Sequence, residues 1–324
     1  MAETILEIDN LTSGYQVKQG RVEAVKEVSF KLGSGEFLGI AGESGCGKST
    51  LAYSILKLLE DNGQIFSGSI NYGGQNLATL SDKAMKKVRW SKISMVFQSA
   101  MNALNPVITI KEQLLDAMYA HRPGLKEKEA IARAKELLEL VNITPDRLYD
   151  YPHQLSGGMK QRIMIAMAMI LQPDIIIMDE PTTALDVVVQ RNIIEKIGDL
   201  QEKFGFSIIF ITHDLSLLVE ISDRLAIMYA GRLVELGNAE EIYKNPAHPY
   251  TEGLMASFPP LVGEIKEVGG IPGKPPDFFK LPTGCKFETR CPYAFARCKK
   301  ENPEFKSYDS SGRLARCFLA GEER

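Results

Sequence analysis

The chain has 324 residues, of which 44% are hydrophobic and 24% are charged. This ordinary globular mixture excludes extensive disorder, collagen-like repeats and disulfide-rich scaffolds, and the length allows two domains or one large domain with an appendage. With 38 Lys and Arg residues against 41 Asp and Glu residues, the net charge of −3 argues against a general nucleic-acid-binding protein, which usually has a basic balance.

No membrane-spanning or secretory segment is expected. The longest apolar run, residues 163–171, is far shorter than the roughly 20 residues that a transmembrane helix needs. The N-terminal residues Met-Ala-Glu-Thr-Ile-Leu-Glu have neither the basic start nor the apolar stretch of a signal peptide. We therefore expect the chain to stay in a reducing compartment, where clustered cysteines bind metal more often than they form disulfides.

The expected elements alternate between short apolar runs and longer helical patterns. Residues 5–8 and 25–32 alternate with period two, as in an antiparallel sheet. Buried strands are expected at residues 36–41, 94–97, 175–178 and 207–211. Helices are expected at residues 48–60, 126–141, 159–171 and 187–203. This order predicts an α/β fold with a largely parallel sheet covered on both faces, together with an N-terminal antiparallel β subdomain.

Two further segments set the expected domain boundaries. Residues 110–150 are helical in pattern, and we place an inserted helical subdomain at about residues 99–170. From residue 259 to residue 284 the composition changes, because eleven of these 26 residues are Pro or Gly, which is typical of an extended connector. We therefore predict a large domain over residues 1–258 and a connector with a small cysteine-rich extension over residues 259–324.

A glycine-rich loop follows the strand at residues 36–41. Residues 42–50 fit the phosphate-binding pattern G-x-x-x-x-G-K-[ST], between a strand and a helix. Glycines let backbone N–H groups approach phosphate oxygens, Lys48 supplies a positive charge, and the Ser49 hydroxyl can bind Mg²⁺. The residues predicted to contact a nucleotide are Gly42, Ser44, Gly45, Cys46, Gly47, Lys48, Ser49 and Thr50. The alternative is an accidental glycine-rich turn, and Cys46 is interpreted as a variable loop position rather than a nucleophile.

An acidic pair ends a later apolar strand. Asp179 and Glu180 follow residues 175–178 directly. Asp179 would complete the Mg²⁺ shell, and Glu180 would orient or deprotonate an attacking water. A strand with a charged turn is common by itself, but together with the phosphate loop it predicts a nucleoside triphosphatase.

Between these two motifs, residues 155–162 read Leu-Ser-Gly-Gly-Met-Lys-Gln-Arg directly before a helix. Ser156, Gly157 and Gly158 would form a second phosphate-binding helix start, with an ordinary helix cap as the alternative. The segment resembles the LSGGQ signature of the ATP-binding cassette (ABC) family, with Met159 in place of the glutamine. This departure lies outside the Ser-Gly-Gly that contacts nucleotide in that family.

The resemblance implies the catalytic residues. Gln98 matches the family glutamine that senses Mg²⁺ and the attacking water, and His213 matches the histidine that contacts the γ-phosphate. With Glu180 they are the catalytic candidates, a structural role being the alternative for His213. The implied Mg²⁺ ligands are Ser49, Gln98 and Asp179.

The resemblance also implies a composite site. Tyr15 matches the aromatic residue that stacks on adenine, an ordinary surface or core tyrosine being the alternative, and residues 184–186 match a loop that crosses the dimer interface. ATP and Mg²⁺ bound by one subunit would be closed over by residues 156–158 of another.

Two C-terminal segments resemble the extension of ATPase subunits of oligopeptide and dipeptide importers, of the D type rather than the F type. They are residues 245–251, Asn-Pro-Ala-His-Pro-Tyr-Thr, and residues 284–293. The implied partners are two integral-membrane permease subunits, a second and paralogous ATPase and an extracytoplasmic binding protein, with no nucleic acid. The protein would lie on the cytoplasmic face of the cell membrane, with its helical insertion against the permeases. Di- or oligopeptides are the first expected solutes, and oligosaccharides or nickel are the alternatives.

Four cysteines cluster in this extension, at positions Cys285, Cys291, Cys298 and Cys317. None is paired as C-x-x-C, which argues against an ordinary zinc ribbon, and the wide spacings suit a [4Fe-4S] cluster. Related importer ATPases carry such a cluster at matching cysteines, and nearby basic residues such as Arg290 would offset its negative charge. Zinc, or thiols that are unliganded or disulfide-linked, are the alternatives.

The competing function is a non-transport ABC ATPase with a regulatory or nucleic-acid role. A single phosphate loop and the lack of a sustained heptad segment favour the importer, since non-transport members usually carry tandem cassettes or long insertions. An inactive binding scaffold is disfavoured by the intact Lys48, Asp179, Glu180 and His213.

Overall fold

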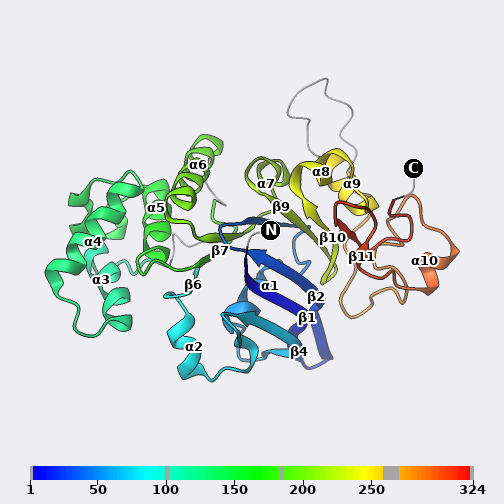
Figure 1. The fold of residues 1–324 in the computed structure, drawn as a ribbon, viewed down its shortest axis with the longest axis horizontal. Coiled ribbons are helices and arrows are strands. Elements are labelled where there is room, and N and C mark those ends of the chain that lie inside the picture. The colour runs from blue at the N-terminus through cyan, green and yellow to red at the C-terminus, as the bar shows by residue number, and fades with distance from the viewer. Residues whose placement is uncertain (1–2, 99–102, 183–185, 258–269, 322–324) are drawn as a thin grey trace.

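The computed structural model describes residues 3–98, 103–182, 186–257 and 270–321 (Figure 1). The start of the expected helical insertion, residues 184–185 of the expected interface loop and the first part of the connector lie outside the described residues.

The N-terminal residues form an antiparallel sheet of order β2-β1-β4-β5. Its strands are β1 (Thr4–Val17), β2 (Gly20–Gly33), β4 (Gly63–Tyr72) and β5 (Gln75–Asn76). Leu6 and Ile8 on β1 and Val25 on β2 are fully buried, and they pack in one cluster with Leu51 of α1 (Lys48–Leu56). The period-two alternation therefore buries one face of this sheet against the helix that follows the phosphate loop. This confirms the predicted antiparallel β subdomain.

The larger sheet has the order β11-β12-β10-β9-β3-β8-β7-β6. Its strands are β3 (Phe37–Ala41), β6 (Ile93–Val96), β7 (Ile175–Asp179), β8 (Ser207–Ile211), β9 (Arg224–Tyr229), β10 (Arg232–Asn238), β11 (Lys306–Ser307) and β12 (Leu314–Ala315). Strands β9, β3, β8, β7 and β6 run parallel. Every residue of β3, β7 and β8 is buried, as expected for parallel strands that are covered on both faces.

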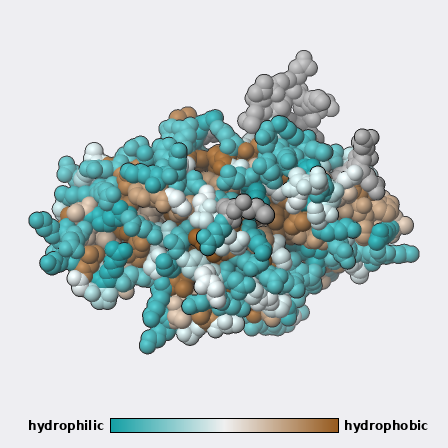
Figure 2. Space-filling view, in the orientation of Figure 1, coloured by the Kyte–Doolittle hydropathy of each residue, from teal (hydrophilic) through white to brown (hydrophobic). Residues whose placement is uncertain are grey.

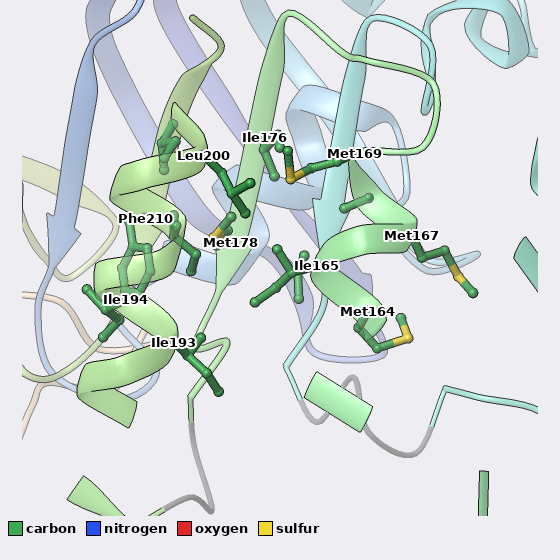
Figure 3. Packing of buried hydrophobic residues seen from close by; sticks show 14 of the residues in the cluster. Met164, Ile165, Met167, Met169, Ile176, Met178, Ile193, Ile194, Leu200 and Phe210 are labelled. Atoms are coloured by element: carbon green, nitrogen blue, oxygen red, sulfur yellow. The ribbon is translucent and has the colours of Figure 1, made fainter. Parts of the chain in front are cut away.

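Helices cover this sheet on the side away from the N-terminal strands. They are α5 (Gly157–Ala168), α6 (Val187–Phe204), α7 (Leu215–Ile221), α8 (Ala239–Lys244) and α9 (Pro249–Ala256). Figure 3 shows Ile165 of α5 directed toward β7, and Ile165, Ile194 of α6 and Met178 of β7 belong to one buried cluster. A second core therefore fixes α5 and α6 on either side of the strand that ends in the acidic pair.

The helical subdomain lies at one end of the molecule, on the left of Figure 1. It contains α3 (Ile110–His121), α4 (Glu127–Leu140) and the short η3 (Pro145–Tyr149) and η4 (Pro152–Gln154). Thr109 and Glu112 form a capping box that starts α3, in which each side chain accepts from the other residue's backbone N–H. A connecting segment with η1 (Leu77–Thr79) and α2 (Asp82–Val88) leads from the N-terminal sheet to β6.

The C-terminal residues lie at the opposite end, beside α9 and β10 (Figure 1). Here β12 pairs with β10, and β11 pairs with β12, both antiparallel. The short helix α10 (Ala296–Lys300) carries Cys298. The last strands of the chain thus extend the edge of the main sheet.

Within the described ranges, no helix combines the length and the apolar character that crossing a bilayer requires. The face shown in Figure 2 is largely hydrophilic, with apolar side chains in scattered areas.

Candidate nucleotide-binding site

The phosphate loop connects the buried strand β3 to α1, as the sequence predicts. Lys48 is 6% exposed, and its Nζ donates to the carbonyl oxygens of Gly42 at 2.7 Å and Glu43 at 3.1 Å. The ammonium group is therefore held on the loop's own backbone. In the described loop, no side chain caps the first turn of α1, so its N–H groups remain available to an anion.

Two positions of the loop require glycine, because of their backbone conformation and because a side chain would have no room. Gly42 and Gly47 have φ values of +153° and +108°, which favour glycine. A Cβ atom on Gly47 would lie 2.1 Å from the carbonyl oxygen of Ala24, and one on Gly42 would lie 2.3 Å from that of Met228. The loop thus passes between backbone segments of both sheets with no room for a side chain.

The remaining loop residues have different environments. Ser44 and Gly45 are exposed, whereas Cys46 is buried. Burial raises the pKa of the Cys46 thiol above its ordinary value, so the thiol stays protonated at neutral pH and is a poor nucleophile. The Tyr15 hydroxyl lies 3.4 Å from Oγ1 of Thr50, which brings this tyrosine to the first turn of α1.

The buried carboxylate of Asp179 is the feature of this site that bears on metal binding. Its side chain is fully buried at the end of β7, and among the described residues neither Oδ atom has a hydrogen-bond partner. Burial raises the pKa of this carboxyl; the neighbouring charge of Glu180 also raises it, while Ser49 and Lys48 lower it. A buried carboxylate is costly unless a cation compensates it, and carboxylate and hydroxyl oxygens suit Mg²⁺. Asp179 and Ser49 therefore fit the expected ion.

Gln98, Glu180 and His213 come together although they belong to three separate motifs. Nε2 of Gln98 donates to Oε2 of Glu180 at 2.8 Å, and Nδ1 of His213 lies 3.5 Å from Oε1 of Glu180. The three residues follow the neighbouring parallel strands β6, β7 and β8. Ligand sites of open α/β sheets lie at this carboxyl edge.

The backbone of Glu180 helps to place its carboxylate. Its φ is +46°, which is rare for a residue with a side chain. Its N–H donates to the carbonyl of Ile211 at 2.8 Å, which ties the turn after β7 to the end of β8. The side chain of Glu180 is 17% exposed and that of His213 is 66% exposed, so both can be reached from solvent.

The signature residues stand apart from the phosphate loop within one chain. Ser156 is the N-cap of α5, where its hydroxyl accepts from the N–H of Met159 at 3.3 Å. Ser156 and Gly157 are exposed, and α5 lies to the left of α1 in Figure 1. Among the described residues, no hydrogen bond joins Ser156, Gly157 or Gly158 to the phosphate loop.

One contact to the phosphate loop is absent from the sequence-based prediction. The guanidinium of Arg290 forms two hydrogen bonds to the carboxylate of Glu43, Nη1 to Oε2 at 2.7 Å and Nη2 to Oε1 at 2.9 Å. Glu43 also donates its N–H to the Tyr250 hydroxyl at 2.8 Å. The sequence predicts that Arg290 offsets the charge of an iron–sulfur cluster, whereas the structure pairs it with Glu43. No local sequence signal links residues 247 positions apart, so only the folded chain reveals the pair.

The prediction of a [4Fe-4S] cluster is wrong, and zinc lacks a ligand set as well. In the part of the chain that the structure describes, which includes all four cysteines, no group of three or more His, Cys, Asp or Glu residues could hold a metal ion. Cys298 is buried, and Cys285 and Cys291 pack against the main core. Burial raises the pKa of the Cys285 thiol to about 12. Cys285 and Cys291 thus pack as small hydrophobic side chains do.

Comparison with known proteins identifies the family. The ABC transporter family matches residues 25–183, and the oligopeptide/dipeptide transporter C-terminal region matches residues 234–298. The oligopeptide transport ATP-binding protein AppD of Bacillus subtilis is 42% identical over 99% of this chain and 98% of its own length. The dipeptide transport ATP-binding protein DppD of B. subtilis is 44% identical over 98% of this chain and 95% of its own length.

Solved structures agree with this assignment. The dimeric structure of MJ0796, a bacterial ABC transporter cassette, aligns with a TM-score of 0.65 at 30% identity, over 72% of this chain and 99% of that one. Together, the two matched regions, the full-length relatives and the shared fold show that this chain belongs to the ABC transporter family, as an ATP-binding subunit of the oligopeptide/dipeptide type.

Proposed function

We propose that this chain binds and hydrolyses MgATP at the edge formed by residues 42–50, Asp179, Glu180, Gln98 and His213, as a motor of peptide import. The observation that carries this proposal is the convergence of Gln98 and His213 on the carboxylate of Glu180. This carboxylate follows directly on the buried and unpartnered Asp179. The ATPase class itself follows from family membership.

Each residue contributes a distinct step. Backbone N–H groups of the loop and the start of α1 bind the phosphates, and Lys48 adds a positive charge. Ser49, Asp179 and Gln98 would hold Mg²⁺, which when bound offsets charge on the transferring phosphoryl group.

Glu180 orients the attacking water and accepts its proton, a contribution of about 10²–10⁴ in rate for a general base. His213 contacts the γ-phosphate, and Tyr15 stacks on adenine.

A second ATPase completes the site in this proposal. The exposed Ser156 and Gly157 and the half-buried Gly158 at the start of α5 would close over ATP bound to the partner, and residues 184–186 would cross the interface. The similar cassette solved as a dimer supports such an arrangement. Since the D-type relatives are named as transport proteins, we infer a paralogous second ATPase and two membrane permeases. The chain would lie on the cytoplasmic face of the membrane.

Peptides are the proposed solutes because the matched C-terminal region and the relatives named here are described as oligopeptide or dipeptide transporters. The test is affinity purification of the tagged chain from detergent-solubilised membranes, with the co-purifying proteins identified by mass spectrometry. We expect two polytopic permeases and a second ATPase, and the associated binding protein should bind peptides. Recovery from the soluble fraction alone, or a binding protein that takes only sugars or nickel, would contradict the proposed function.

A further inference from the structure

The phosphate loop contains a carboxylate at a position where a negative charge is unfavourable. Glu43 follows Gly42 directly, and its carbonyl accepts from Nζ of Lys48 at 3.1 Å. Its side chain is 25% exposed, so water screens its charge only in part. An unpaired carboxylate here would repel the triphosphate that the loop binds and would compete for Lys48.

Arg290 compensates this charge from the other end of the chain. Its side chain is 4% exposed, and both Nη atoms contact the carboxylate of Glu43. Its Nε donates to the carbonyl of Pro272 at 2.8 Å. The planar guanidinium therefore fixes the direction of the Glu43 side chain as well as its charge, which a lysine could not do with a single point charge.

An aromatic cluster holds this contact in place. The rings of Tyr229, Tyr250 and Phe287 lie 4.6–5.4 Å apart, and the Arg290 guanidinium lies 5.8 Å and 5.9 Å from the ring centroids of Tyr229 and Phe287. Tyr250 is fully buried. Its hydroxyl accepts from the N–H of Glu43, so the cluster contacts both the backbone and, through Arg290, the side chain of one loop residue.

The segment that carries Tyr250 is itself anchored. His248 caps the start of α9 and accepts from the N–H of Tyr250 through Nδ1 at 3.0 Å. The buried Glu235 of β10 accepts from the N–H groups of Ala247 at 2.8 Å and His248 at 3.0 Å. These bonds give the His-Pro-Tyr segment a physical role, because they hold the Tyr250 hydroxyl against the phosphate loop.

We propose that Arg290 is a positioning residue for nucleotide binding, which neutralises Glu43 and holds its carboxylate away from the bound phosphates. The C-terminal extension thereby sets the affinity of the phosphate loop for MgATP. By linkage, nucleotide binding stabilises the packing of the extension to the same degree. This inference rests on the proposed function, since it takes residues 42–50 as the nucleotide site.

The test is a double-mutant cycle on the full-length chain, with equilibrium binding of a fluorescent ATP analogue in the presence of Mg²⁺. Arg290→Met leaves the Glu43 carboxylate unpaired, and we expect about tenfold weaker binding or more. Glu43→Gln should bind at least as tightly as wild type. The double variant removes the repulsive charge, so it should recover to within about threefold of wild type.

Further variants separate this effect from general damage. Arg297→Met is the matched control. Arg297 pairs with Glu301 at the exposed C-terminal end of α10, so this variant should leave binding unchanged. Arg290→Lys keeps the charge without the fork and should show an intermediate loss. Thermal unfolding shows whether Arg290→Met folds. If it does not, the same comparison of MgATP affinity is made between Arg290→Lys alone and Arg290→Lys combined with Glu43→Gln. In the ATPase assay, the KM for ATP should rise more than kcat falls.

The outcomes distinguish the inference from the proposed function. Unchanged MgATP affinity in Arg290→Met overturns the inference. A folded double variant that binds MgATP as weakly as Arg290→Met also overturns it, because lost packing rather than charge would then explain the weaker binding. If the folded wild-type chain binds no MgATP, the proposed function itself fails.

Discussion

The nucleotide edge and the cysteine-rich end of this molecule differ in how far the sequence determines where their side chains lie. At the nucleotide edge, Gln98, Glu180 and His213 follow adjacent parallel strands, so the topology of the sheet brings them together. At the other end, the cysteines lie on short irregular segments and on α10, where no regular element fixes their spacing in space. The spacing of a motif indicates its chemistry when helices and strands fix where its residues lie. The segments that carry the cysteines include few such elements, so their spacing is a poor guide to a metal site.

The largest effect is expected at Glu180. Glu180→Gln keeps the shape of the side chain but removes its ability to accept a proton, so ATP hydrolysis should fall by about 10²–10⁴ while MgATP still binds. Steady-state turnover and nucleotide binding, measured on the same preparation, check this. The exposed Glu202 on α6 provides the control, since Glu202→Gln should hydrolyse ATP at the normal rate. Wild-type turnover by Glu180→Gln would remove Glu180 from the mechanism.

Gly47→Ala should come next. The new Cβ would lie 2.1 Å from the carbonyl oxygen of Ala24 at a φ of +108°, and such backbone strain costs about 1–3 kcal/mol. We expect loss of MgATP binding and a lower free energy of unfolding, measured by ligand titration and chemical denaturation. Gly198→Ala in α6 is the matched control, because open space surrounds Gly198 and alanine favours helix. Equal behaviour of the two variants would contradict the packing described here.

Asp179→Asn should improve stability while weakening the Mg²⁺ site. The raised pKa of Asp179 means that folding favours the protonated carboxyl. Its contribution to stability is therefore full below the ordinary carboxyl pKa and is lost as pH rises through the folded-state pKa. At neutral pH without nucleotide, the neutral asparagine should raise the free energy of unfolding.

MgATP should then stabilise Asp179→Asn less than wild type, because the carboxylate ligand is missing. Thermal unfolding with and without MgATP measures both effects. A variant that is less stable than wild type without nucleotide, or is stabilised equally by MgATP, would show that Asp179 is not a buried metal ligand.

The smallest effect is expected at the cysteine end. Because burial raises the pKa of Cys285 from 9.0 to about 12, its contribution to stability is full at neutral pH and is lost as pH rises from 9 toward 12. Cys285→Ala should weaken that alkaline dependence, and iron or zinc chelators should leave the melting temperature of wild type unchanged at pH 7. Stoichiometric iron in an anaerobic preparation would contradict the lack of a metal site among the described residues.

The sequence predicted the two sheets, the phosphate loop and the acidic pair because each rests on local pattern. Period-two alternation identified β1 and β2, and fully apolar runs identified β3, β7 and β8. It could not predict the Glu43–Arg290 pair, since the two residues meet only through the C-terminal segment's packing on Tyr229 and Phe287. Likewise, the left-handed backbone of Glu180 has no signal in an acidic residue after a strand.

The most direct test of the account is ATP hydrolysis by the full-length chain assembled with its co-purified membrane partners, with and without a peptide-loaded binding protein. We expect Mg²⁺-dependent hydrolysis that rises when peptide is supplied and is lost in Lys48→Ala, because Lys48 contributes the positive charge of the phosphate loop. Hydrolysis that persists in Lys48→Ala, or that does not respond to peptide, would contradict a peptide-import motor working at this site.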